Sequence, residues 1–162
     1  MLQPGSIITI FWWAIYTILG VWAQRVVPGV DFLAPGIVLS MQEQPGHRTL
    51  WLAVIWIFLL EGVGSLPFGY GVAWYGLLVV FYIVGRWLFE ARSILFMCLL
   101  GAGLGVLHPL LSYSLAQLAN LTIPLKTAML EGVVQAVTFP AVWLAADHFF
   151  PKRFRQDVKP LY

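Results

Sequence analysis

Charged residues are scarce in this sequence. Only 10% of its 162 residues are Asp, Glu, Lys or Arg, whereas soluble proteins average about 25%. A soluble domain of this size needs polar side chains over a large surface, and the chain has too few of them. With 60% hydrophobic residues and a mean hydropathy of +0.86, the composition indicates an integral membrane protein.

Cysteine and catalytic motifs are also nearly absent. Cys98 is the single cysteine, so it forms neither an internal disulfide nor a Cys-based metal site. A net charge of +2 that is confined to loops is too weak for nucleic-acid binding. The sequence contains no phosphate-binding loop, nucleophile elbow or His-Glu-x-x-His zinc motif. We therefore expect a protein with no catalytic residues, no metal site and no cofactor.

Long uncharged runs, in contrast, are plentiful. Five of them cover residues of about 6–24, 49–65, 70–88, 93–119 and 127–149. Runs of about 20 apolar residues predict transmembrane helices, because the strands of a membrane barrel alternate in polarity instead. The shorter run 32–40 would cover only about 14 Å as a helix. It is either a short or re-entrant second element or an interfacial helix, so we expect an all-α compact bundle of five to six transmembrane helices.

The positions of the cations predict the orientation. Residues 1–150 form one polytopic transmembrane domain, and 151–162 form a short basic tail. Six elements with a cytoplasmic N-terminus leave only Arg25 and Lys126 outside, as the positive-inside rule requires. The sequence thus predicts a multi-pass protein of a bacterial inner membrane whose C-terminal tail is cytoplasmic and contacts anionic membrane lipid. The cations expected in the cytoplasm are Arg48, Arg86, Arg92, Lys152, Arg153, Arg155 and Lys159.

Glu61 is the residue that we expect to be most costly to bury. A carboxylate deep in a span costs about 2.5–3.5 kcal/mol on insertion scales, so it should face the bundle interior or a partner. Two roles stay open: Glu61 accepts backbone N–H groups at the turn that follows it, or it contacts a ligand or partner. That turn is predicted because glycine and proline end helices, and its residues are Gly62, Gly64, Pro67 and Gly69.

Two further polar residues lie inside predicted spans. Glu131 lies five residues after Lys126, so we expect it to be solvated or paired with that lysine. His108 precedes Pro109, and its side chain is expected to bond backbone carbonyls that the proline frees. Both are candidates for structural or partner-binding roles within the membrane, and the three histidines lack the spacing of a metal site.

Small residues mark two helix faces that predict close helix packing. Gly101 and Gly105 are four residues apart in one predicted span, and Ala141 and Ala145 are four apart in the last. Small residues at this spacing let helix backbones approach closely in lipid. We expect these faces to contact other helices, within the bundle or in a partner.

Residues 32–92 resemble the central part of the MreD family of rod shape-determining membrane proteins. The resemblance lies in the short Phe32–Leu39 element before Gly46-His47-Arg48, in the acidic end of the next span with the small-residue turn Glu61–Gly69, and in an aromatic-rich span that closes on a basic loop, Arg86–Arg92. The family commonly has Asp at the position of Glu61 and Gly at that of Pro67.

The resemblance implies a non-enzymatic membrane scaffold of the cell-elongation (rod) machinery that links peptidoglycan synthesis to cell shape. Its implied partners are MreC, MreB and the RodA–transpeptidase complex, and its implied fold is similar to the substrate-binding components of energy-coupling-factor vitamin transporters. Such a component is one alternative function, although its Ala-x-x-x-Ala motif is on the first helix and here occurs only on the last. The membrane anchor of a respiratory complex is the other alternative.

Overall fold

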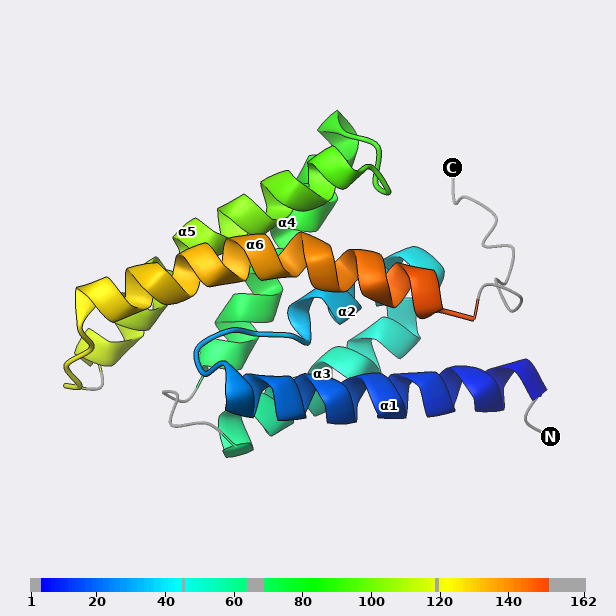
Figure 1. Cartoon of the computed structure of the whole chain (residues 1–162), viewed down its shortest axis with the longest axis horizontal. Coiled ribbons are helices and arrows are strands. Elements are labelled where there is room, and N and C mark those ends of the chain that lie inside the picture. Colours follow the sequence, from blue (N-terminus) through cyan, green and yellow to red (C-terminus); the bar gives the residue numbers. More distant parts are fainter. Residues whose placement is uncertain (1–3, 45, 64–68, 119, 152–162) are drawn as a thin grey trace.

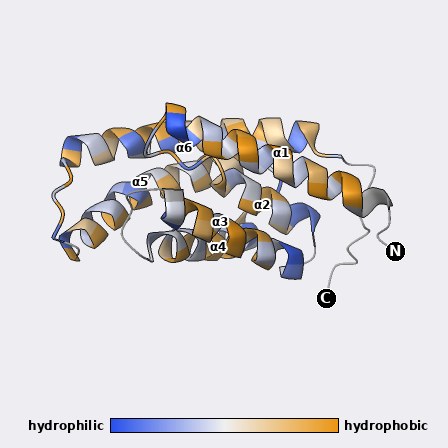
Figure 2. Cartoon of the chain, turned by 90° about the horizontal axis from the view of Figure 1, so that it is seen from below, coloured by the Kyte–Doolittle hydropathy of each residue, from blue (hydrophilic) through white to orange (hydrophobic). Residues whose placement is uncertain are grey.

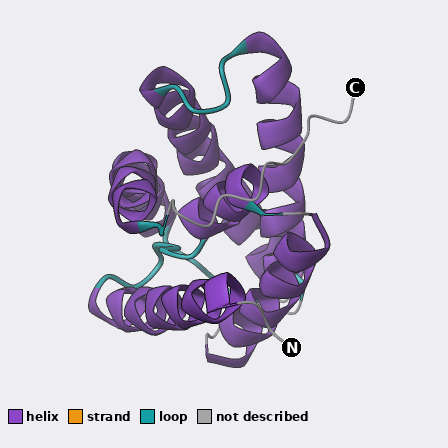
Figure 3. Cartoon of the chain, turned by 90° about the vertical axis from the view of Figure 1, so that its right-hand side faces the viewer, coloured by secondary structure: helices purple, strands orange, loops and turns teal. Residues whose placement is uncertain are grey.

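Six helices form the regular structure of the described chain. The computed structural model describes residues 4–44, 46–63, 69–118 and 120–151. Every regular element among them is a helix (Figure 3), which confirms the predicted all-helical class. In chain order the helices are α1 (Pro4–Val26), α2 (Ala34–Glu43), α3 (Gly46–Val63), α4 (Tyr70–Leu88), α5 (Ile94–Leu118) and α6 (Leu125–Phe149).

Four of these helices are long and apolar enough to cross a membrane. They are α4, α5, α6 and the part of α1 from Ile7 to Val26. Apolar residues extend along the helices (Figure 2), and many large hydrophobic side chains on their outer faces are exposed. The described chain is thus that of a multi-pass helical membrane protein. The predicted span 49–65 corresponds to α3, which is not one of the four, and its last two residues lie outside the described residues.

The short helix α2 lies inside the bundle. Its ten residues extend for about 15 Å, and every residue from Ala34 to Ser40 is buried. Pro35 occupies the first turn, where a missing backbone N–H leaves no helical hydrogen bond unmade. Helices α3, α4 and α6 all pack against α2. Residues 32–40 thus contribute to a short helix, as expected, and its burial among three other helices differs from that of a helix lying at a membrane surface.

The helices alternate in direction along the long axis of the molecule. Figure 1 shows that α1 and α6 run antiparallel, and that the start of α1 and the end of α6 lie at the same end. A hydrogen bond joins these two regions, from Nε1–H of Trp12 to the carbonyl oxygen of Phe149, at 3.1 Å. The chain doubles back after α1, so that the Tyr16 hydroxyl donates to the Phe32 carbonyl oxygen at 2.8 Å.

Helices α5 and α6 pack together more closely than any other helix pair in the described bundle, and glycine residues allow this close approach. A Cβ on Gly105 would lie 2.6 Å from the carbonyl oxygen of Gly132, and one on Gly101 would lie 2.7 Å from that of Ala136. Both distances are too short for a real side chain, so the two backbones approach where only hydrogen atoms fit. Gly101 and Gly105 therefore lie in a contact within the bundle.

Candidate functional site

Glu61 closes the end of α3 against the start of α4. Its Oε1 accepts the backbone N–H of Gly69 at 3.0 Å. Gly69 has a φ of +89°, a left-handed conformation that glycine adopts without strain. This contact is the turn-capping role left open for Glu61. Gly62 lies in the last turn of α3, where nothing lies within 4 Å of an added Cβ, while Gly64 and Pro67 lie outside the described residues.

Glu131 and His108 meet between α5 and α6, with Tyr70 of α4 as the third member. Nε2 of His108 lies 3.1 Å from Oε2 of Glu131, and a 3.0 Å hydrogen bond joins Nδ1 of His108 to the Tyr70 hydroxyl. Each ring nitrogen of His108 thus lies within hydrogen-bond distance of a side-chain oxygen, one on α6 and one on α4. Glu131 therefore contacts His108 and not the expected Lys126. His108 in turn contacts the side chains of Glu131 and Tyr70, and not the backbone carbonyls expected near Pro109.

Asp31, which precedes α2, accepts three hydrogen bonds through its carboxylate. Its Oδ1 accepts from Nε2 of Gln24 at 2.9 Å and from the backbone N–H of Leu33 at 2.8 Å, and its Oδ2 accepts from Nε1 of Trp74 at 2.9 Å. Burial raises the pKa of the Asp31 carboxyl, while the hydrogen bonds from the Leu33 backbone and from Trp74 oppose that rise. The carboxylate therefore joins α1, α2 and α4 through contacts of its own.

Gln135 holds the same segment against α6. It is fully buried in the middle of that helix. Its Oε1 accepts the backbone N–H of Asp31 at 2.7 Å, and its Nε2 donates to the backbone carbonyl of Asp31 at 3.2 Å. One side-chain amide thus satisfies both backbone groups of a residue that is 104 positions away. This arrangement fixes the depth at which the chain re-enters the bundle before α2.

A second polar cluster lies at the opposite end of α2. Arg92, in the loop between α4 and α5, forms an ion pair with Glu43 and lies 3.9 Å from Oδ1 of Asp147. The Glu43 side chain is almost fully buried. Gln42 joins the cluster by donating from Nε2 to the backbone carbonyl of Ala91 at 2.6 Å. Arg92, predicted only as a cytoplasmic cation, thus ties the ends of α2 and α6 to the α4–α5 loop.

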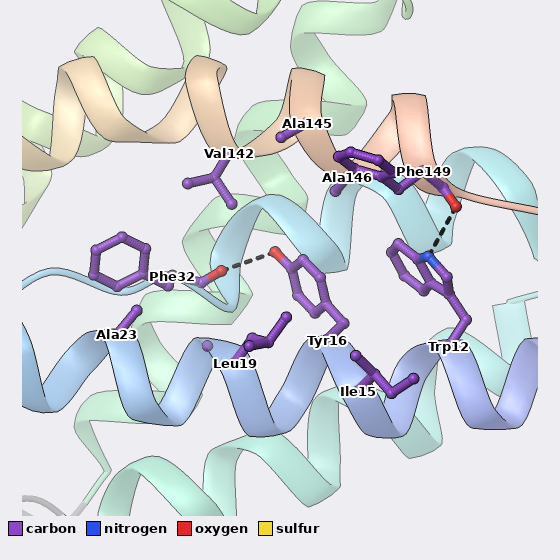
Figure 4. Close-up of a pocket in the computed structure, with 11 residues that line it drawn as sticks. Trp12, Ile15, Tyr16, Leu19, Ala23, Phe32, Val142, Ala145, Ala146 and Phe149 are labelled. Carbon is purple, nitrogen blue, oxygen red and sulfur yellow. Dashed lines mark hydrogen bonds between the residues drawn. The ribbon is translucent and has the colours of Figure 1, made fainter.

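An apolar groove separates α1 from α6 on the outer surface of the bundle. Its volume is about 380 Å³, and Figure 4 shows side chains of the two helices facing each other across it, with Phe32 at one end and the Trp12–Phe149 hydrogen bond at the other. We call this feature the α1–α6 groove. Its lining residues are Trp12, Ile15, Tyr16, Leu19, Gly20, Ala23, Phe32, Val142, Ala145, Ala146 and Phe149.

Small residues make up part of both walls of the α1–α6 groove. Gly20 and Ala23 belong to α1, and Ala145 and Ala146 belong to α6. Ala145 is exposed, as is Ala141 one turn before it, and both also line a shallow depression on the outer face of α6. The Ala141–Ala145 face therefore points away from the bundle, whereas the Gly101–Gly105 face is used within it. The outward face is available to a helix that is not part of the described chain.

The two histidines other than His108 lie at the surface. His47 and His148 are exposed at the two helix ends where they occur, and the His148 ring packs edge-on against Phe149. Within the described ranges, no group of three His, Cys, Asp or Glu residues is positioned to hold a metal ion.

Sequence reasoning missed Asp31, Gln135 and Glu43. A signal was present for two of them: Gln135 is an amide inside an apolar run, and Asp31 follows a Pro-Gly turn and opens the apolar run 32–40. Comparison with protein-family models, with curated proteins and with solved structures finds no match to this chain. The geometry described above is therefore the basis for any functional inference.

Proposed function

We propose that this chain is a non-enzymatic membrane scaffold that binds the single transmembrane helix of a partner protein along the α1–α6 groove. The observation that carries the proposal is the groove itself, which is apolar, open at the surface and has small residues of both helices among its bulkier lining side chains. In lipid, the hydrophobic effect does not drive helices together, so association depends on close packing at small residues. A groove with two such walls suits a helix.

The hydrogen bonding of the interior polar side chains favours a scaffold over a ligand-binding transport component. Asp31, His108 and Gln135 each form hydrogen bonds with other groups of the same chain. A binding site for a water-soluble vitamin needs polar side chains that face a pocket and can form hydrogen bonds with the ligand. In this bundle the three side chains instead join helices to each other. We therefore favour the scaffold over the vitamin-binding component and over the anchor of a respiratory complex.

The resemblance to MreD suggests which partner occupies the groove. We propose MreC, and through it MreB and the RodA–transpeptidase complex of the rod machinery. In this proposal the chain spans a bacterial inner membrane with six elements, α2 and α3 included, in an arrangement similar to that of energy-coupling-factor substrate-binding components. Arg48, Arg86 and Arg92 then lie at the cytoplasmic side together with the C-terminal end of α6, as the positive-inside rule favours.

The test is co-purification with MreC from the same organism after co-expression. Ala145→Leu places a larger side chain on the wall of the groove, so we expect recovery of MreC to fall several-fold. Ala102→Leu is the matched control, because Ala102 is also exposed but lies on α5, outside the groove. Equal recovery with both variants would contradict groove binding. A monomer that retains one bound vitamin would favour the transporter component instead.

A further inference from the structure

A second depression lies on the other side of α1, against α3. Its volume is about 510 Å³, and we call it the α1–α3 furrow. Apolar side chains form most of its walls, among them Trp13 and Ala14 on α1 and Ile55 and Trp56 on α3. The charged and amide side chains of the lining occur where α3 begins, at Arg48 and Gln44, and Thr9 and Thr17 on α1 add hydroxyl groups. The furrow is therefore amphipathic along its length, with one apolar part and one polar end.

Arg48 gives the polar end a positive charge. It is the one ionised side chain among the residues that line the furrow, and it makes no ion pair with any residue in the described ranges. Glu43, the acid nearest to it in sequence, is paired with Arg92. Arg48 also lies in the first turn of α3, where unbonded backbone amides add a partial positive charge. The polar end is thus complementary to an anion.

The length of the apolar part follows from the helices that form it. Arg48 and Ile55 are seven residues apart on α3, so the apolar wall extends about 10 Å along the helix from Arg48. The indole rings of Trp13, Trp51 and Trp56 line this furrow, and Ala14 is the smallest side chain on its walls, so a helix backbone cannot approach closely along its length. A thin flexible chain fits the space better.

We propose that the α1–α3 furrow binds an anionic phospholipid of the surrounding bilayer. One acyl chain lies against Trp13, Ala14 and Ile55, and the phosphate is bound by Arg48. The planar guanidinium donates two parallel N–H groups to phosphate oxygens, a geometry that a neutral amide cannot provide. Trp51, exposed one turn after Arg48, lies where an indole prefers the headgroup level. This binding requires no partner protein and is independent of the proposed scaffold role.

The test compares two lipids that differ only in headgroup. The purified full-length chain in mild detergent is titrated with dioleoyl-phosphatidylglycerol or dioleoyl-phosphatidylcholine, and bound lipid is counted by native mass spectrometry. We expect the wild-type chain to retain phosphatidylglycerol at several-fold lower concentration. Arg48→Gln should abolish that preference, while Arg86→Gln should keep it, because Arg86 is exposed on α4 and does not line the furrow.

A second variant tests the apolar part. Ala14→Phe fills the furrow without changing charge, and since Ala14 is exposed the bundle should still fold. We expect this variant to retain less of both lipids. Equal retention of the two lipids by the wild-type chain, or equal loss of preference in Arg48→Gln and Arg86→Gln, would overturn the proposal in favour of general attraction between surface charges and lipid. Unchanged retention by Ala14→Phe would overturn the acyl-chain placement.

Discussion

The buried polar side chains of this protein act as connectors between helices. Asp31 accepts from side chains of α1 and α4, and Gln135 of α6 binds both backbone groups of Asp31. A buried polar group that lacks a partner is costly in an apolar environment, so each of these contacts also specifies which helices meet and at what depth. Because each connector serves several helices, single substitutions at these residues should have measurable effects on stability.

Gln135→Leu should destabilise the bundle. The substitution removes an acceptor and a donor together and leaves the backbone N–H and carbonyl of Asp31 without partners, which costs about 1–3 kcal/mol of unfolding free energy. Thermal unfolding in detergent, followed by tryptophan fluorescence, measures the change. Gln117→Leu is the control, because Gln117 is exposed near the end of α5. A loss of stability no greater than that of the control would show that the Gln135–Asp31 hydrogen bonds do not stabilise the bundle.

Substitutions of Glu61 separate its hydrogen-bonding role from its charge. Glu61→Gln keeps a side-chain oxygen for the N–H of Gly69 and should leave both stability and recovery of a partner nearly unchanged. Glu61→Leu removes the acceptor and should cost about 0.5–2 kcal/mol, as the loss of a helix cap does. Thermal unfolding and co-purification with MreC are measured on the same samples. Loss of partner recovery in the Gln variant would instead assign a binding role to the carboxylate.

Local contacts among these residues could be predicted from the sequence, and distant ones could not. The Glu61 turn was identified because the acid, the glycines and the proline lie within nine residues. Proximity in sequence likewise favours solvent or Lys126 as the partner of Glu131, yet its side chain contacts His108, 23 positions away. The Asp31–Gln135 contact joins residues 104 positions apart, and no periodicity or motif carries information about such a pair.

At the scale of helices, glycine decides which pair packs most closely. Helices α5 and α6 approach through Gly101, Gly105 and Gly132, whereas α1 meets α3 through side chains, with Nε1–H of Trp56 donating to Oγ1 of Thr17 at 2.9 Å. The boundaries of the long helices follow from the charges that flank apolar runs, so they could be predicted. The burial of α2 could not, because a ten-residue apolar run fits an internal helix and an interfacial one equally well.

Gly105→Ala tests this close approach directly. The new Cβ would lie 2.6 Å from the Gly132 carbonyl oxygen and 2.7 Å from the Ala136 Cβ, so the helices must separate. We expect a loss of about 1–3 kcal/mol of unfolding free energy, as for other overpacked contacts. Gly76→Ala is the control, because nothing lies within 4 Å of its new Cβ. It should be neutral or stabilising by up to about 1 kcal/mol, since alanine favours helix. Equal melting temperatures would contradict the packing.

At the scale of the whole molecule, α1 is flanked by two depressions of different character. The α1–α6 groove has small residues on both walls, and the α1–α3 furrow has indole rings and one arginine. The long helices, by comparison, bury their polar contacts in the interior and present apolar side chains outward. Recognition of neighbours in the membrane is therefore expected on the two sides of α1, with a protein helix on one side and a lipid on the other.

Cross-linking across the α1–α6 groove tests the central claim most directly. In a Cys98→Ser background, Ala145→Cys is co-expressed with MreC that carries single cysteines along its transmembrane helix, and disulfide formation is scored on non-reducing gels. We expect a cross-linked pair with a helical periodicity of reactive MreC positions, because one face of that helix meets α6. Ala102→Cys on α5 should form none. Equal cross-linking from both positions, or none from residue 145 while MreC still co-purifies, would contradict binding in the groove.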